Sequence, residues 1–202
     1  MELGELLLNG KNRVEIIPAD AACAKINADY YGADGQTTFG MLITQSGGVV
    51  VNGAVRLLGS NQDPNFRDIC LFNVKHGSAG LVFIGDDIFG GIFAVNTGLF
   101  SPDNLGSIMY LAPDTLEWED TELQLSGLFA WLKDGDMAGF YGQFSEEEYN
   151  ALCARNVGFN KVLSFYPPQW SAEFSNGERD VREIDVNEHY RLCFQADPPQ
   201  AE

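Results

Sequence analysis

Positive charge is scarce in this sequence. The 202 residues include 12 lysines and arginines against 29 aspartates and glutamates, which gives a formal net charge of −17. Nucleic-acid affinity depends on cationic side chains that replace the counterions of the phosphates, so the composition disfavours binding of DNA or RNA. An anionic membrane surface is disfavoured for the same reason. A basic protein would be attracted, although the same charge would also serve solubility alone.

Metal-binding and redox patterns are also missing. The two histidines, His76 and His189, lie far apart in the sequence, and neither has a ligand motif near it. The four cysteines show no zinc spacing. A chain of this length has no need of disulfides, so each cysteine is expected to pack as a small apolar side chain. We therefore predict no metal and no cofactor.

Long apolar runs are absent as well. No segment approaches the roughly 18 apolar residues of a membrane-spanning helix. The opening MELGELLLNGKNR has too short an apolar stretch for a secretion signal, and an acidic residue precedes its first basic one. The sequence therefore predicts a cytoplasmic protein that does not bind membranes.

Common catalytic motifs do not occur. The chain has no Gly-x-Ser-x-Gly, no phosphate loop ending in Gly-Lys-Ser/Thr and no Gly-x-Gly-x-x-Gly. We therefore predict that the protein is not an enzyme. One alternative stays open, because a hydrolase that uses a divalent cation could employ Asp86 and Asp87, or the pair Glu117 and Glu119 on one face of a strand. Such residues more often cap a turn or form a solvated acidic face.

The pattern of apolar residues predicts the fold class. Apolar residues make up 45% of the chain and aromatic residues 12%, enough to bury a core. Short apolar runs between turn signals predict strands, and Asn52-Gly53 predicts a hairpin. Asp20 and Ser145 are predicted to cap helices, and the Glu148 side chain is expected to bond back to the Ser145 amide. We predict a single α+β domain over residues 1–195 and a polar, frayed tail at 196–202. The expected strands cover residues 14–17, 49–51, 55–58, 81–84, 91–95, 108–111 and 115–119, with a turn at 85–87; the expected helices cover 20–26, 126–133, 136–144 and 145–153, and 182–194 is a helix or a strand.

Acidic and aromatic residues outside the expected core are the candidates for binding a partner. Trp131 lies off the simplest apolar stripe of its helix, and Trp170 ends the aromatic, proline-rich segment 165–170, which is either a recognition edge or a lid over the core. A third possibility is self-association through that segment, and we expect a monomer or a weak homodimer. The predicted partner-binding residues are Asp86, Asp87, Glu117, Glu119, Asp120, Trp131 and Trp170.

Four segments carry a resemblance to known families. They are 55–60 (VRLLGS), 85–96 (GDDIFGGIFAVN), 106–120 (GSIMYLAPDTLEWED) and 126–132 (SGLFAWL). Over most of its length, from about Val14 to about Trp170, the chain resembles a bacterial domain-of-unknown-function family, number twenty-six twenty-five. The turn glycines and aromatics also resemble the SUKH superfamily, which includes the Syd proteins and yeast cell-wall-assembly regulators. The sequence departs from that pattern at Asn52-Gly53-Ala54, where an Asp and a Trp are expected.

The resemblance implies a fold and a kind of function. The fold would be α+β, with a curved, mainly antiparallel sheet and flanking helices. Many members of the superfamily are immunity proteins that bind and neutralise bacterial toxins, many of them nucleases. A basic nuclease would suit an acidic inhibitor electrostatically. The family supplies no catalytic residues.

Overall fold

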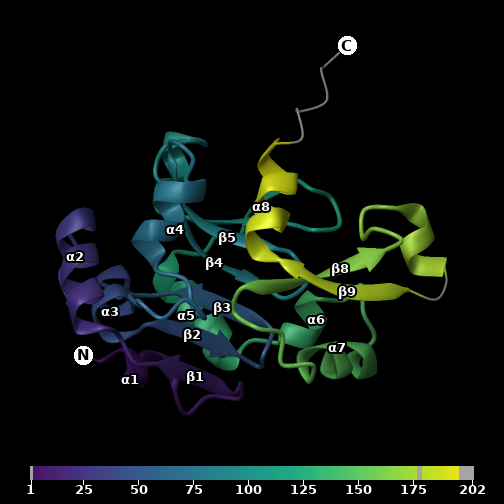
Figure 1. Ribbon diagram of the computed structural model, residues 1–202, viewed down its shortest axis with the longest axis horizontal. Helices are drawn as coiled ribbons and strands as arrows, with labels where there is room; N and C mark the ends of the chain where they lie inside the picture. Colours follow the sequence, from purple (N-terminus) through teal and green to yellow (C-terminus); the bar gives the residue numbers. More distant parts are fainter. Residues whose placement is uncertain (1, 177–178, 196–202) are drawn as a thin grey trace.

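Seven strands follow one another in sequence order across one antiparallel sheet. The computed structural model describes residues 2–176 and 179–195, so the predicted tail at 196–202 lies outside the described residues. Each strand pairs with the next, which leaves β1 and β7 at the two edges (Figure 1). The strands are β1 Val14–Ile17, β2 Gly48–Val51, β3 Val55–Leu58, β4 Leu81–Asp87, β5 Ile92–Asn96, β6 Ile108–Leu111 and β7 Trp118–Asp120.

Helices and a second, two-stranded sheet complete the domain. β8 Lys161–Tyr166 pairs with β9 Asp180–Asp185, and Figure 1 shows this ribbon beside α8, on the side of the molecule away from α2. The fold is therefore α+β, and its large sheet is not closed into a barrel. The helices are α1 Leu3–Leu7, α2 Ala21–Tyr31, α3 Thr38–Gln45, α4 Ile69–His76, α5 Leu125–Asp134, α6 Met137–Phe140, α7 Glu146–Cys153 and α8 Val186–Gln195, with 3-10 turns at Pro102–Asn104 and Ala172–Asn176.

Both faces of the large sheet are buried. Successive side chains of a strand point to opposite faces, so Phe93 packs in one core while its neighbours Ile92 and Ala94 pack in the other. The first core includes side chains from α1, α5, α6 and α7, and the second includes side chains from α4, α8 and β8. Cover on both faces explains why the central strands read as continuous apolar runs.

Local signals fixed several elements correctly. The Asn52-Gly53 hairpin is confirmed, because both residues have positive φ (52° and 71°) and Val51 pairs with Val55. Asp20 caps α2 as predicted, accepting hydrogen bonds from the amides of Ala22 and Cys23. The helix then runs past the predicted end at Ile26 and stops at Gly32, where φ is 60°.

The predicted turn at 85–87 is wrong. These residues belong to β4, and the chain reverses after Asp87, where the amide of Gly91 donates to the Asp87 carboxylate over 2.8 Å. A bulge shifts the register between Phe83 and Gly85. This bulge lets β4 continue through a glycine and two aspartates that otherwise signal a turn.

The predicted strand at 115–119 is correct only from Trp118 onward. Residues 113–117 form a turn, in which the amide of Leu116 donates to the carbonyl of Ala112 and Leu116 has a φ of 59°. The alternation of apolar and polar residues from 115 to 119 therefore did not reflect a strand over its whole length.

Two predictions near the C-terminus need adjustment. The segment predicted as either a helix or a strand is both, because β9 runs directly into α8. Ser145 caps α7 as expected, but the side chain of Glu148 does not return to the Ser145 amide. It forms an ion pair with Arg179 instead, at 2.8 Å. In the part of the chain that the structure describes, no helix combines the length and apolarity needed to cross a membrane.

Candidate functional site

Asp86 is part of a buried ion cluster and cannot touch a partner. It is fully buried on the β4 strand and accepts hydrogen bonds from the guanidinium groups of Arg56 (2.8 Å) and Arg67 (2.9 Å). Burial alone would raise the pKa of Asp86, but the two arginine charges outweigh burial and hold the pKa below its usual value. Arg56 also donates to the carbonyls of Gly158 and Lys161, so the cluster connects the large sheet to β8. Its role is structural.

Asp87 is equally buried, but Arg56 reaches only its backbone carbonyl (3.3 Å), and the donors to its carboxylate in the described chain are uncharged. Its carboxylate accepts from the amides of Phe89 (2.9 Å) and Gly91 (2.8 Å) and from the hydroxyls of Tyr110 (2.7 Å) and Tyr141 (3.0 Å). Burial raises the pKa of Asp87, and the hydrogen bonds only partly offset that effect. The prediction that Asp86 and Asp87 contact a partner is therefore wrong, because neither side chain is exposed.

The orientation of the two side chains also excludes the metal site that Asp86 and Asp87 would share in the alternative hypothesis of a cation-dependent hydrolase. Asp86 lies on the sheet face of Arg67 and Asp87 on the face of Tyr141, because neighbours in a strand point in opposite directions. One cation cannot reach both carboxylates. Within residues 2–176 and 179–195, no group of three or more His, Cys, Asp or Glu side chains is placed to hold a metal ion.

The other predicted acidic residues gather at the β7 edge of the sheet. Glu117, Glu119 and Asp120 are exposed on β7 and on the turn before it. No lysine or arginine occurs between Lys75 and Lys133, so the strands β4 to β7 bring no positive side chain to this edge. We call this surface the acidic edge; its exposed residues are Asp114, Glu117, Glu119, Asp120 and Glu122.

One cavity opens beside the acidic edge on the α5 side. It has a volume of about 250 Å³ and brings together three predicted site residues, Glu119, Asp120 and Trp131. Trp131 is half-buried and packs edge to face against Phe140, with ring centroids 5.0 Å apart. We call it the Trp131 cavity; it is also lined by Phe93, Tyr110, Thr121, Leu123 and Leu128.

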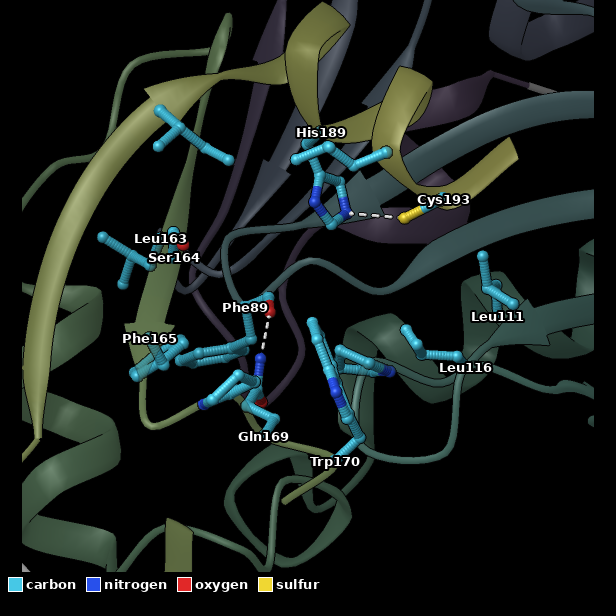
Figure 2. Close-up of a pocket in the computed structure, with 14 residues that line it drawn as sticks. Phe89, Leu111, Leu116, Leu163, Ser164, Phe165, Gln169, Trp170, His189 and Cys193 are labelled. Atoms are coloured by element: carbon cyan, nitrogen blue, oxygen red, sulfur yellow. Dashed lines mark hydrogen bonds between the residues drawn. The ribbon is translucent and has the colours of Figure 1, made fainter. Parts of the chain in front are cut away.

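A second cavity lies beside the turn at 113–117, which supplies Pro113 and Leu116 to its lining. Its volume is about 340 Å³, and Figure 2 shows Trp170 and Leu116 lying along one side of it, with His189 and Cys193 of α8 above. Trp170 is 57% exposed and Leu116 is 45% exposed, so both are accessible at the rim. We call it the Trp170 cavity; most of its lining is apolar and includes Leu111, Pro113, Leu163, Phe165, Ile184 and Leu192.

Two polar side chains of the Trp170 cavity hold the β4–β5 turn in place. The Gln169 amide donates to the carbonyl of Phe89 over 2.6 Å (Figure 2), and Nε2 of His189 lies 2.8 Å from the carbonyl of Gly90. The φ of Gly90 is +102°, and a Cβ atom there would lie 3.0 Å from His189 Cε1. Glycine is therefore required where α8 approaches the turn.

The His189–Cys193 pair does not have the features of a catalytic nucleophile and base. Sγ of Cys193 lies 3.6 Å from His189 Nε2, which also faces the Gly90 carbonyl. A carbonyl only accepts, so Nε2 carries the hydrogen and cannot take the thiol proton. Burial raises the pKa of Cys193 to about 11, which leaves little thiolate at neutral pH.

Several site residues were not found by sequence reasoning. Arg56 gave a readable signal, because a lone arginine in the apolar run of β3 indicates a buried ion pair. Leu116 gave none, since its alternation with Trp118 indicated an inward side chain. His189 was set aside as an isolated histidine, and only the folded chain places it at a cavity.

Together these features define a class: an acidic α+β protein with two small cavities near the β7 edge of its sheet. The chain belongs to the family described as "Protein of unknown function DUF2625", whose model matches residues 1–189. It is 28% identical to the uncharacterized protein YbfG of Escherichia coli (strain K12) over 192 residues, covering 94% of this chain and 87% of the relative. It is 26% identical to an uncharacterized protein of Haemophilus influenzae over 203 residues, covering 95% and 87%. No solved structure matches.

Proposed function

We propose that this protein is a non-catalytic domain that binds a basic protein through the acidic edge and the Trp170 cavity. One observation carries the proposal. The turn at 113–117 presents exposed carboxylates, Asp114 and Glu117, on the same few residues that supply Pro113 and Leu116 to an apolar cavity. Charge and an apolar anchor point are thus adjacent, as in interfaces whose affinity comes from a few buried contacts within a polar rim.

The charge distribution supports a cationic partner. Like charges at Asp114, Glu117 and Glu119 add to a local negative field, because no lysine or arginine occurs in residues 76–132. Such a field speeds the encounter with a basic protein, and it is screened beyond about 8 Å at physiological salt. The acidic edge therefore acts mainly on the association rate, and its effect falls as salt rises.

The Trp170 cavity supports a specific contact after the encounter. Trp170, Leu116 and Leu192 are exposed apolar side chains around it. Burying an apolar side chain of the partner there would contribute about 1.5–3 kcal/mol. Exposed tryptophan beside a cavity is typical of binding hot spots.

The resemblance to immunity proteins makes the partner more specific within this proposal. A secreted toxin that acts on nucleic acid is basic, and an acidic protein can occupy its substrate-binding surface. We propose that a toxin of this kind, encoded beside this protein, is the partner.

The test is binding of the products of the neighbouring genes, measured by biolayer interferometry across a range of salt concentrations. The variant Glu117→Lys/Glu119→Lys reverses the acidic edge. The matched control, Glu15→Lys/Asp29→Lys, makes the same change in net charge on exposed residues of β1 and α2, away from β7. We expect the first variant to weaken binding at least tenfold, a change of about 1.4 kcal/mol, and the control to stay near wild type.

Three results would refute the proposal. Equal weakening by both variants would mean that only total charge matters. Binding that does not change with salt, or absence of binding by any neighbouring gene product, would remove the cationic partner altogether.

A further inference from the structure

The Trp131 cavity combines aromatic walls with a carboxylate, and we propose that it binds an organic cation: an ammonium or guanidinium head on an alkyl chain. The inference rests on the residues that line this cavity and stands whether or not a protein binds the acidic edge.

Three aromatic rings form its walls. The ring centroids of Tyr110 and Phe140 are 5.2 Å apart with an interplanar angle of 64°, and those of Phe140 and Trp131 are 5.0 Å apart at 66°. The rings thus pack edge to face along one side of the cavity. The face of an aromatic ring carries partial negative charge, so a cation in the cavity is attracted to any ring face that lines it.

The deep walls are fixed before a ligand arrives. Tyr110 is buried and donates its hydroxyl hydrogen to Asp87 over 2.7 Å. Its ring centroid lies 4.7 Å from that of Phe93, which is also buried. A ligand therefore loses little affinity to ordering of these side chains. Phe140 is 42% exposed and Trp131 is half-buried, so the cavity remains accessible.

The charge at the cavity favours a cation over a neutral ligand of the same shape. Glu119 and Asp120 line it, and no lysine or arginine is among its lining residues in the described chain. Tyr110 and Glu119 are direct partners across β6 and β7, which places this carboxylate beside the aromatic wall. A cation that enters meets a carboxylate as well as the rings.

The size of the cavity limits the ligand. At about 250 Å³ it is smaller than the sites of drug-sized molecules, which are roughly 300–1,000 Å³. It suits one head group on a short chain. A lysine or arginine side chain of a protein would fit this description, and so would a small free methylated ammonium compound.

The experiment follows the indole N–H signals of the protein by NMR during titration. The signal of Trp131 is assigned with Trp131→Phe, and the other two tryptophans, Trp118 and Trp170, serve as internal references. The cationic probes are n-butylammonium, n-butylguanidinium and choline. The neutral probes are n-butanol and 3,3-dimethylbutanol, which match n-butylammonium and choline in shape.

We expect a cationic probe to shift the Trp131 signal and to bind at least tenfold more tightly than its neutral match. Phe140→Leu, which removes one ring of the cavity and keeps the Trp131 signal, should weaken cation binding about tenfold, and Trp170→Leu, at the other cavity, should leave it unchanged. Glu119→Gln should weaken it most at low salt. If Phe140→Leu fails to fold, Glu119→Gln tests the carboxylate contact with the same Trp131 signal.

The outcomes separate cleanly. Tighter binding of n-butylammonium or n-butylguanidinium identifies a protein side chain as the source, and tighter binding of choline identifies a free methylated cation; either supports the site. Equal binding of neutral and cationic probes, no shift at Trp131, or unchanged affinity in a folded Phe140→Leu variant would overturn it.

Discussion

Asp86 and Asp87 offer a matched pair of substitutions with opposite expected outcomes. The residues are neighbours on β4, and both are fully buried. Asp86→Asn leaves Arg56 and Arg67 buried without an anion, and breaking such a pair costs about 3–5 kcal/mol. Asp87→Asn keeps one oxygen for the amides of Phe89 and Gly91, while its NH₂ group can donate to the tyrosine hydroxyls after they rotate. We expect that change to cost about 1 kcal/mol or less.

The pH dependence of the two carboxylates should also have opposite signs. The pKa of Asp86 is lowered below the ordinary value of 3.8, so its contribution is present above 3.8 and is lost as pH falls through the lowered pKa. The pKa of Asp87 is raised, so its contribution is greatest below 3.8 and is lost as pH rises through the raised pKa. Asp87→Asn removes the second effect. The free energy of unfolding of this variant, relative to that of the wild type, should therefore rise as pH increases from 3.8 toward neutrality.

Urea unfolding followed by tryptophan fluorescence measures both variants under the same conditions. For a domain of this size, a difference of about 3 kcal/mol corresponds to roughly 6–12 °C in melting temperature. Equal losses in the two variants, or a larger loss for Asp87→Asn, would contradict the assignment of the arginine cluster to Asp86 alone.

Three further predictions concern the turn at 113–117, the cysteine of the Trp170 cavity and metals. Leu116→Gly removes a backbone strain of about 1–2 kcal/mol, because glycine tolerates positive φ, but it also removes partly buried apolar contacts. The free energy of unfolding in urea should therefore change by less than about 1 kcal/mol, while binding to the proposed partner weakens. A large loss of stability would show that Leu116 packs in the core. Near pH 8, Cys193 should react with iodoacetamide more slowly in the native protein than in the unfolded protein. The native rate should rise as pH approaches the Cys193 pKa of about 11, and peptide mass spectrometry measures it. Saturating Mg²⁺, Ca²⁺ or Mn²⁺ should leave the melting temperature unchanged, whereas a rise that EDTA reverses would reveal a metal site.

The fold was predictable where local chemistry alone decides the backbone. The Asn52-Gly53 hairpin, the Asp20 cap and the apolar runs of β3 and β5 all act within a few residues of the chain, and each is found where the sequence placed it. Burial on both faces also made the central strands easy to recognise, because a short continuous apolar run without helical periodicity is typical of a strand that is covered on both faces.

The environment of the two aspartates was not predictable in this way. The partners of Asp86 are Arg56 and Arg67, and the partners of Asp87 include Tyr110 and Tyr141, residues far from it in sequence. The sequence near Gly85-Asp86-Asp87 does not indicate that buried hydrogen-bond donors lie on both faces of the sheet at these positions. A glycine followed by two aspartates favours a turn locally. The hydrogen bonds to residues distant in sequence stabilise a strand instead.

The turn at 113–117 is where local preference and structure disagree most usefully. A position with φ near +60° favours glycine or asparagine, yet the chain has leucine there, and its side chain is 45% exposed. Neither backbone preference nor core packing explains a strained, exposed leucine. Strain that is retained without a packing benefit is expected at functional positions. Leu116 also lies at the rim of the Trp170 cavity beside exposed carboxylates, so the backbone, the exposure and the charge at this turn all agree with the proposed contact with a partner.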